Sequence, residues 1–287
     1  MFKLILEYCL ILICFCISVI TMIKLIQNQF TYHPDKIKSK QDFMNCENIM
    51  EKINKKKLYA IDEISIKTSD NKILNALYLK NPTTPLHVIY AHGNAGNIYD
   101  RTNVLLNFAK FGSVLMFDYR GYGKSSGSPT EAGLYLDIYS VWTFLIKNNI
   151  EPQNIVLYGE SLGSSVSAWL AMTLSKQKIY PRALVIQSGF SSIKNLVAEV
   201  MPKFVKYIVQ NEYPTDKYIS EISLVVPIMI VHSPEDTFID ISHKDKLMTA
   251  ASNVCSYYEI SGDHNSPKLD DDFYRQMNEY FTSLKTI

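Results

Sequence analysis

Beyond residue 57 the chain alternates short apolar runs with segments of helical periodicity, and this alternation constrains the fold more than any other feature. Runs that are apolar throughout are typical of strands covered on both faces, as in a parallel sheet, and the amphipathic segments between most of them indicate helices. The expected strands cover residues 87–92, 113–119, 154–159, 182–188, 227–233 and 255–261, and the expected helices cover residues 97–110, 131–148, 162–176, 241–252 and 271–285.

Two earlier segments, residues 59–68 and 73–80, alternate apolar and polar side chains. This pattern is typical of strands with one face exposed to solvent, and the short connection between them favours an antiparallel pair. Together with the buried strands they predict an α/β fold, with a mostly parallel sheet of about eight strands and helices on both faces. We expect one domain over residues 58–287, with a small cap insertion over residues 190–226.

The N-terminus is apolar over residues 4–26, where only Glu7 and Lys24 are charged. A spanning helix takes roughly 20 apolar residues, so the length suffices if the side chains near both ends reach the membrane interface. A cleavable signal peptide would have a shorter apolar region followed by a cleavage site with small residues. We therefore predict an uncleaved single-pass membrane anchor over residues 1–27 and a connector over residues 28–57, with the side of the membrane left open.

Charge and cysteine spacing argue against several classes of function. The formal net charge is +1 and the charged residues are interspersed, so we expect no nucleic-acid partner. The five cysteines lack the paired spacing of a zinc or dithiol site. Cys46 and Cys255 are isolated in the sequence, and a disulfide between them would need an oxidising compartment. We expect neither a metal ion nor an organic cofactor.

A serine stands in the pattern Gly-x-Ser-x-Gly, in "YGESLG", where an expected strand meets an expected helix. In such a sharp turn the serine takes a strained conformation that exposes its hydroxyl, and Gly159 and Gly163 leave room for neighbouring elements. The alternative is a serine that caps a close-packed turn. We predict that Ser161 is a nucleophile and that the backbone amide of Leu162 donates a hydrogen bond to an oxyanion.

A serine nucleophile needs a base, and a histidine later in the chain is the expected partner. Both His243 and His264 follow Ser161 in the sequence. His243 begins an expected helix, whereas His264 lies in a glycine-containing loop after the last expected strand. Because ligands gather at the carboxyl ends of parallel strands, His264 is the predicted base.

The acid that orients this histidine should follow a strand between the serine and the histidine. The loop "HSPEDTFID" offers Glu235, Asp236 and Asp240. We expect Glu235 to point the other way along the loop and Asp240 to cap the next helix. Asp236 is therefore the predicted acid, which would fix the imidazole tautomer and stabilise the imidazolium.

The loop "HGNAGN" after the strand at 87–92 carries glycines that let the backbone approach a substrate. A second oxyanion donor is expected from this loop, and the backbone amide of Asn94 is the predicted donor. His92 is expected to brace the loop. The glycine spacing matches neither a Walker A motif nor a dinucleotide-binding fingerprint, which argues against a phosphate-binding turn.

Five motifs occur in the order found in the α/β-hydrolase superfamily, namely "HGNAGN", "DYRGYGKSSGSPTEAGLYLD", "YGESLG", "HSPEDTFID" and "GDHN". From about residue 58 onward the sequence resembles the branch of α/β-hydrolase domain proteins that includes single-pass membrane serine hydrolases and protein depalmitoylases. The resemblance implies an α/β-hydrolase fold and a triad of Ser161, Asp236 and His264. The sequence departs from this branch at Asn97, where an acidic residue is common, and at Ser233, where glycine is usual.

These features predict a membrane-anchored serine hydrolase that cleaves a carboxylic ester or thioester through an acyl-enzyme. Its substrate would be a small ester, a lipid or an acylated protein, an acyl-protein thioesterase being one form, and a lipid bilayer would be its partner. The alternative is a catalytically inactive fold that binds or tethers at a membrane. Apolar residues at helical spacing in the cap insertion admit two interpretations, packing onto the sheet, which we favour, or a wall for an acyl chain.

Overall fold

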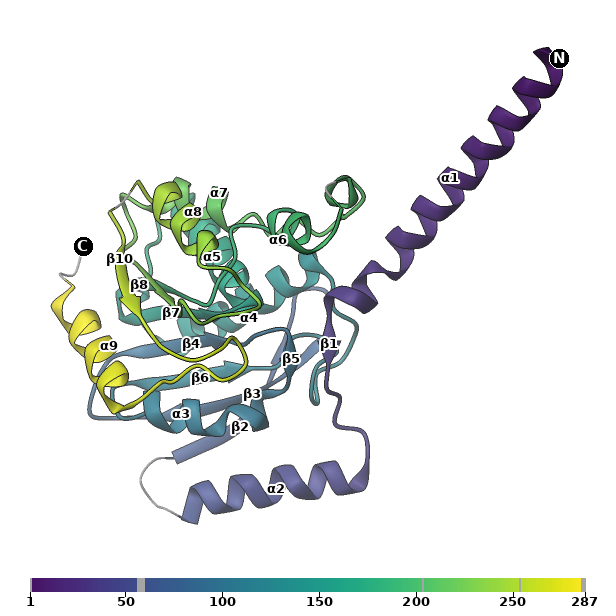
Figure 1. Ribbon diagram of the computed structural model, residues 1–287. Helices are drawn as coiled ribbons and strands as arrows, with labels where there is room; N and C mark the ends of the chain where they lie inside the picture. The colour runs from purple at the N-terminus through teal and green to yellow at the C-terminus, as the bar shows by residue number, and fades with distance from the viewer. Residues whose placement is uncertain (1, 56–59, 203, 253, 285–287) are drawn as a thin grey trace.

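The computed structural model describes residues 2–55, 60–202, 204–252 and 254–284 (Figure 1). Two predicted ends, Tyr59 of the first expected strand and Lys285 of the last expected helix, lie outside these residues. The strands are β1 His33–Pro34, β2 Ala60–Lys67, β3 Ile73–Lys80, β4 His87–Ala91, β5 Ala95–Gly96, β6 Ser113–Phe117, β7 Ile155–Glu160, β8 Ala183–Gln187, β9 Ile228–His232 and β10 Ser256–Glu259. The α-helices are α1 Phe2–Thr31, α2 Lys40–Lys55, α3 Thr102–Phe108, α4 Glu131–Lys147, α5 Leu162–Ser175, α6 Ile193–Val200, α7 Thr215–Ile222, α8 Ser242–Ala250 and α9 Asp271–Ser283, and short 3-10 helices are η1 Ile98–Arg101, η2 Pro152–Asn154 and η3 Val205–Tyr207.

Eight strands form one sheet in the order β10-β9-β8-β7-β4-β6-β3-β2. β3 pairs antiparallel with both β2 and β6, and the remaining neighbours in this sheet are parallel. Helices connect the parallel strands and cover both faces (Figure 1). The predicted sheet, mostly parallel with an antiparallel pair at its start, is confirmed. We refer to residues 60–284 as the sheet domain.

The central strands bury side chains on both faces of the sheet. In β4, Ile89 belongs to the apolar core that includes side chains of α4 and α5, whereas Val88 and Tyr90 belong to the core that includes side chains of α3 and α9. Burial of each such side chain stabilises the fold by about 2 kcal/mol. This two-sided burial explains why the central strands are apolar throughout, because neither face meets water.

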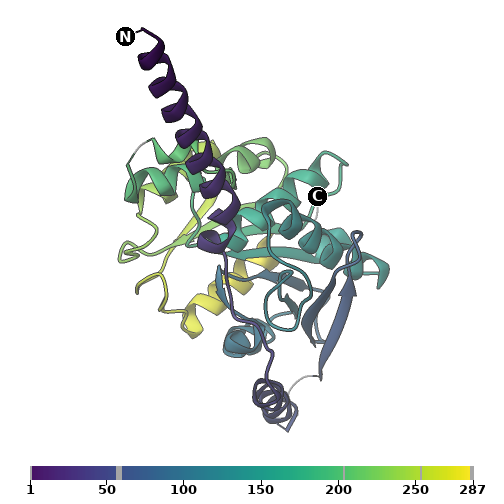
Figure 2. The ribbon, with the colours of Figure 1, turned by 90° about the vertical axis from the view of Figure 1, so that its right-hand side faces the viewer.

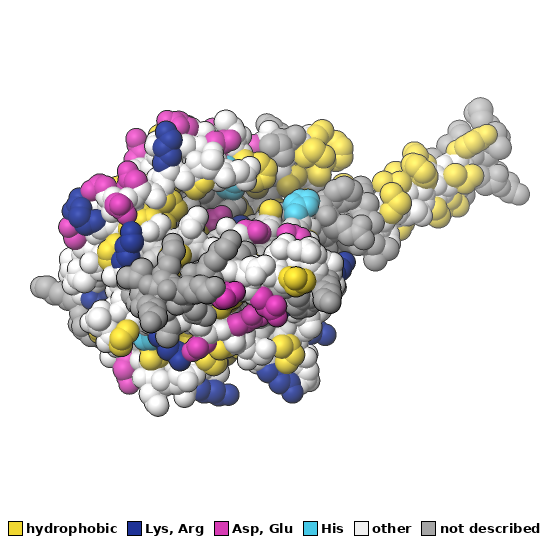
Figure 3. All heavy atoms as spheres, turned by 90° about the horizontal axis from the view of Figure 1, so that it is seen from below, with side chains coloured by type: hydrophobic (Ala, Val, Ile, Leu, Met, Phe, Trp, Pro, Cys, Tyr) yellow, Lys and Arg dark blue, Asp and Glu magenta, His cyan; other side chains and the backbone are white. Residues whose placement is uncertain are grey.

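Helix α1 projects from the sheet domain (Figures 1 and 2). Apolar side chains lie exposed along it (Figure 3). In the described part of the chain, however, no helix combines the length and the apolar character that a bilayer crossing requires. The prediction of a transmembrane helix over residues 1–27 is corrected accordingly, since the uncharged stretch between Glu7 and Lys24 is shorter than the roughly 20 residues of a span. The exposed apolar residues of α1 include Tyr8, Leu10, Ile11, Leu12, Ile13, Phe15, Ile17 and Met22.

The predicted boundary at residue 27 does not coincide with a structural boundary. α1 continues to Thr31, and the chain then forms β1, which pairs in parallel with β5 through the partners His33 and Ala95 and through Pro34 and Gly96. α2 follows in the part predicted as connector. The segment after α1 is therefore joined to the sheet domain by backbone pairing, beside the loop that follows β4.

The cap insertion over residues 190–226 contains α6, η3 and α7. α7 packs against α5 and α8 on one face of the sheet. α6 and η3 instead line a pocket at the carboxyl edge of the sheet, together with the end of α1. The insertion thus serves both as a layer on the sheet and as part of a pocket.

Candidate active site

Ser161 occupies the turn between β7 and α5. Its φ and ψ angles are 52° and −115°, a conformation that residues with side chains rarely adopt. Its amide donates to the carbonyl oxygen of Gln187 at the end of β8 (2.9 Å), and its carbonyl oxygen accepts from the amide of Ser164 (3.0 Å). These bonds hold the strained turn, so the side chain of Ser161 lies in the pocket at the sheet edge.

Two glycines make this turn possible. A β-carbon on Gly159 would lie 2.3 Å from the carbonyl oxygen of Gly163, and one on Gly163 would lie 2.0 Å from the carbonyl oxygen of Ala91 in β4. Both distances are far below van der Waals contact. Helix α5 can therefore approach β7 and β4 this closely only because neither position carries a side chain.

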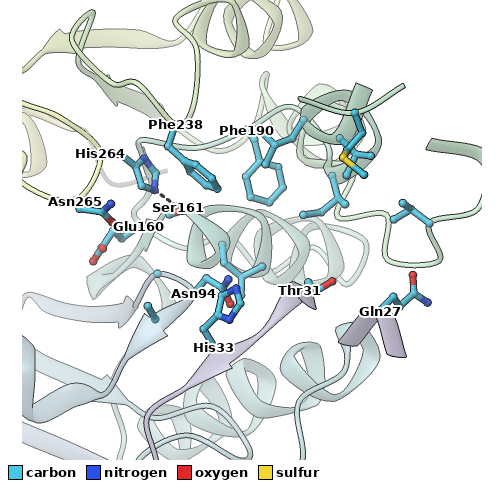
Figure 4. Close-up of a pocket in the computed structure, with 18 of the residues that line it drawn as sticks. Gln27, Thr31, His33, Asn94, Glu160, Ser161, Phe190, Phe238, His264 and Asn265 are labelled. Carbon is cyan, nitrogen blue, oxygen red and sulfur yellow. Dashed lines mark hydrogen bonds between the residues drawn. The ribbon is translucent and has the colours of Figure 1, made fainter. Parts of the chain in front are cut away.

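His264 lies between Ser161 and Asp236. Its Nε2 atom is 3.1 Å from Oγ of Ser161, and its Nδ1 atom is 2.8 Å from Oδ2 of Asp236. The three residues follow β7, β9 and β10, whose carboxyl ends share one edge of the sheet. Figure 4 shows the ring of His264 turned toward Ser161. This geometry allows the imidazole to take a proton from the hydroxyl while the carboxylate holds its other nitrogen.

The carboxylate of Asp236 is buried beneath His264. Burial alone would raise the pKa of Asp236, but the bond to His264 and the amide of Ile239 outweigh it and lower the pKa below its usual value. Asp236 is therefore ionised at neutral pH. The neighbouring Asp263 accepts the amide and the hydroxyl of Thr237, both at 2.8 Å, and so ties the loops after β9 and β10 together.

The alternative acids and the alternative histidine have other partners. Glu235 accepts a backbone amide of the loop that carries His264, at 2.8 Å, and Asp240 accepts the first amide of α8 at 2.9 Å. His243 is buried, and its Nε2 atom is 3.0 Å from the carboxylate of Glu199 in α6. The structure therefore brings Asp236 and His264 to Ser161, and not these three alternatives.

The loop between β4 and β5 faces Ser161, and both Asn94 and Leu162 line the pocket. Among the hydrogen bonds of the described residues, none engages the backbone amides of these two residues. The hydroxyl of Tyr122 donates to the carbonyl oxygen of Asn94 at 2.8 Å and to its Oδ1 atom at 3.1 Å, which fixes the loop. The two amides are thus available to an oxyanion, and their role stays a prediction.

A buried pair of polar side chains supports this loop from behind. Nδ1 of His92 donates to the carbonyl oxygen of Gly93 at 2.7 Å, as expected for a bracing residue, and Nε2 lies 3.7 Å from Oδ1 of Asp118. Burial lowers the pKa of His92 well below its usual value and raises the pKa of Asp118 to about 8. His92 is therefore neutral at pH 7 and Asp118 is mostly protonated, so the two do not form an ion pair.

Arg101 and Glu160 line the pocket beside Ser161, although the sequence analysis singled out neither. Arg101 donates to the carbonyl oxygen of Ala95 at 2.8 Å, and its Nε atom lies 3.5 Å from Oε2 of Glu160. That oxygen also accepts from the hydroxyl of Tyr90 at 2.5 Å. Glu160 could have been found from its place next to the serine, whereas no motif surrounds Arg101.

His33 is a further pocket residue that the sequence analysis assigned to the connector. The pairing of β1 with β5 carries it to the loop that holds Asn94, and Figure 4 shows the two side chains close together. His33 is exposed to solvent and lines the pocket. A strand of two residues has no periodicity, so the sequence held no signal for this contact.

The pocket around Ser161 has a volume of about 740 Å³, which is within the range of sites for small molecules. Most of its apolar lining comes from the cap insertion, so the favoured interpretation of the insertion as packing alone is incomplete. The apolar lining residues are Ala95, Leu162, Phe190, Ile193, Leu196, Val197, Met201, Val205, Val209, Phe238 and Pro267.

The site and its surroundings offer no evidence of a metal centre or a disulfide among the residues that the structure describes. Within the described ranges, no group of three or more His, Cys, Asp or Glu side chains is placed to hold a metal ion. Cys255 carries a free thiol. The side chain of Cys46 lies outside the described part of the chain.

Comparison with known proteins agrees with this architecture. The family described as "alpha/beta hydrolase fold" matches residues 87–217. Protein R595 of Acanthamoeba polyphaga mimivirus is 34% identical over 238 residues, covering 77% of this chain and 81% of the viral protein. Human alpha/beta hydrolase domain-containing protein 17B is 27% identical over 226 residues, covering 77% and 75%. The Pyrococcus furiosus esterase Pf2001 shares the fold with a TM-score of 0.65 at 18% identity, over 89% of this chain and 98% of the esterase. The chain therefore belongs to the α/β-hydrolase superfamily, in its branch of α/β-hydrolase domain-containing proteins.

Proposed function

We propose that this protein is a serine hydrolase that cleaves a carboxylic ester or thioester through an acyl-enzyme. One observation carries the proposal: the run of contacts from Asp236 through His264 to Ser161, at 2.8 and 3.1 Å. Membership of the α/β-hydrolase superfamily supports it. The strained backbone of Ser161 supports it further, because strain of this kind is typical of a serine held out of a sheet for attack.

In the first half-reaction, Oγ of Ser161 attacks the acyl carbonyl carbon and its proton passes to Nε2 of His264. The amides of Leu162 and Asn94 stabilise the negative charge that forms on the carbonyl oxygen. When the tetrahedral intermediate collapses, the bond to the leaving oxygen or sulfur breaks, and His264 gives the proton to that atom. Water then repeats the sequence on the acyl-enzyme and releases the carboxylic acid.

Labelling with a fluorophosphonate tests this assignment directly. We expect the probe to label the wild-type protein and to fail with Ser161→Ala, while p-nitrophenyl ester hydrolysis is lost in the same variant. Ser165→Ala is the matched control, because this buried serine of α5 has no hydrogen-bond partner for its hydroxyl. A folded wild-type protein that neither takes the probe nor hydrolyses esters or acyl thioesters would overturn the proposal.

We propose separately that α1 associates with a lipid bilayer. The support is its set of exposed apolar side chains, which water solvates poorly and a bilayer accommodates. We expect the full chain to float with lipid vesicles and the double variant Ile13→Glu/Ile17→Glu to stay in solution. Leu136→Glu/Ile146→Glu is the control, because both residues are exposed on α4 of the sheet domain. Equal flotation of both variants would contradict a role for α1.

A further inference from the structure

The pocket that holds Ser161 is lined in part by the N-terminal segment. Gln27, Thr31 and His33 line it, although these residues lie far before the sheet domain in the sequence. In Figure 4, Gln27 lies at the end of the pocket opposite to His264, and Thr31 lies between Gln27 and His33. The last turns of α1 thus stand where a ligand extending away from Ser161 would end.

The last turns of α1 form one wall of the pocket, and hydrogen bonds fasten this wall to the sheet domain. Nε2 of Gln27 donates to Oε1 of Gln210 at 2.6 Å, and the backbone amide of Gln210 donates to Oε1 of Gln27 at 2.8 Å. Nδ2 of Asn211 reaches both Oδ1 of Asn28 and Oγ1 of Thr31, each at 3.2 Å. Five polar side chains and one backbone amide therefore join the end of α1 to the segment that follows η3.

A buried contact continues the same attachment. The hydroxyls of Tyr32 and Tyr213 are 2.7 Å apart, and both residues are buried. The amide of Tyr213 donates to the carboxylate of Glu131 at the start of α4. Because buried hydrogen-bonded groups are costly to separate, the end of α1 has a fixed position relative to the sheet.

The pocket between this wall and Ser161 is suited to an aliphatic chain. Its apolar side comes from α6 and the segment after it, with Leu196, Val197 and Val205 among the lining residues. Apart from His33 and His264, the titratable side chains among the described lining residues are the basic Arg101 and the acidic Glu160, which pair with each other beside Ser161. A charged or strongly polar ligand would therefore find no partner along the apolar stretch, whereas a hydrocarbon chain would lose water there.

We propose that the pocket is an acyl-chain subsite whose far end is formed by α1, and that Thr31 and Gln27 set the longest chain it accepts. The proposal rests on the proposed function, since it takes Ser161 as the point where the acyl group is attacked. It adds that the N-terminal helix determines the specificity of the hydrolase. An acyl chain that fits would run from Ser161 along α6 toward Gln27.

The test compares p-nitrophenyl esters from butanoate to hexadecanoate. We expect Thr31→Trp to lower kcat/KM for the longest accepted esters by at least about 10-fold, because the indole fills the end of the pocket, with little change for butanoate. Gln27→Ala should act in the opposite direction and favour longer chains relative to butanoate. Ser18→Trp is the control, since Ser18 is exposed on the same helix and does not line the pocket.

Binding of dodecanoate to Ser161→Ala, measured by calorimetry, tests the subsite independently of hydrolysis. We expect Thr31→Trp in that background to weaken binding by about 10-fold and Ser18→Trp to leave it unchanged. Chain-length profiles and dodecanoate binding that are the same in wild type, Thr31→Trp and Gln27→Ala would overturn the subsite while ester hydrolysis stands. Dodecanoate binding that depends on Thr31, in a protein that hydrolyses no ester or thioester, would instead overturn the proposed function alone.

Discussion

The Nε2 atom of His264 lies 3.1 Å from the Oγ atom of Ser161, although the two residues are 103 positions apart in the sequence. The contact arises because β7 and β10 end at the same edge of the sheet, with β8 and β9 between them. The loop after β10 spans that distance and is held by Asp263, which bonds to Thr237 in the neighbouring loop. The contact between Ser161 and His264 therefore depends on these loops as much as on the serine turn.

Asp236→Asn should lower kcat by about 10,000-fold without unfolding the protein. An asparagine amide donates where the carboxylate accepts, so it would favour the tautomer of His264 that cannot take the serine proton. Steady-state kinetics with a p-nitrophenyl ester measures the loss. The control is Asp240→Asn, because the carboxylate of Asp240 accepts the first backbone amide of α8 and does not contact His264. Equal activity of the two variants would contradict the role of Asp236.

Tyr122→Phe should lower kcat about 10-fold and leave KM nearly unchanged. The lost hydroxyl holds the carbonyl oxygen and Oδ1 of Asn94, so the variant would loosen the predicted oxyanion donor without removing it. The comparison variant is Tyr257→Phe, because the hydroxyl of Tyr257 lies near Glu259 and this residue does not line the pocket. If Tyr122→Phe raised KM and left kcat unchanged, the loop would contribute to substrate binding and not to stabilisation of the oxyanion.

Much of the sheet and of the serine turn could be predicted because the same physical constraint shapes sequence and structure there. Strands such as β4 are apolar on both faces because both faces are covered, and that leaves a continuous run in the sequence. Gly159 and Gly163 are required by backbone contacts that admit no β-carbon. Asp236 and His264 could be singled out because each follows a strand that ends at the same edge of the sheet as the strand before Ser161.

The contribution of the N-terminal segment could not be predicted in this way. Gln27 and Thr31 contact residues far away in the chain through polar side chains, which follow no periodic pattern, and His33 does so through the backbone pairing of a strand of two residues. The length of the apolar stretch predicted a spanning helix, because Glu7 and Lys24 were counted as part of it. The last residues of α1 fall in the predicted connector because their hydrogen-bond partner, Asn211, lies about 180 positions away in the sequence.

Asp118→Asn should change how stability depends on pH. Burial raises the pKa of Asp118 to about 8, against a usual value of 3.8, so the folded state holds a proton that the unfolded chain has lost. Stability from this group is fully present below about pH 4 and is lost as pH rises toward about 8, by up to about 1.4 kcal/mol per pH unit. Asparagine does not titrate, so the variant loses this slope.

Urea unfolding at several pH values between these limits measures the effect. The free energy of unfolding of the wild type, minus that of Asp118→Asn, should fall as pH rises. Asp62→Asn is the control, because Asp62 is a half-exposed carboxylate that pairs with Lys80 on the surface. Parallel curves for wild type and Asp118→Asn would show that Asp118 is ionised in the folded protein.

Gly163→Ala should destabilise the fold by about 3 kcal/mol or more, because the new methyl group would lie 2.0 Å from the carbonyl oxygen of Ala91. That carbonyl belongs to a central strand, so it cannot move without disturbing the pairing of β4 with β7. Relief would require α5 to shift outward, which would also move Ser161 away from His264. Urea unfolding and fluorophosphonate labelling should therefore both report a loss. Ser165→Ala, on the same helix, removes a hydroxyl that has no hydrogen-bond partner and should leave both measurements unchanged. A Gly163→Ala protein as stable and as reactive as Ser165→Ala would mean that close approach of α5 to β4 is not what holds the serine in place.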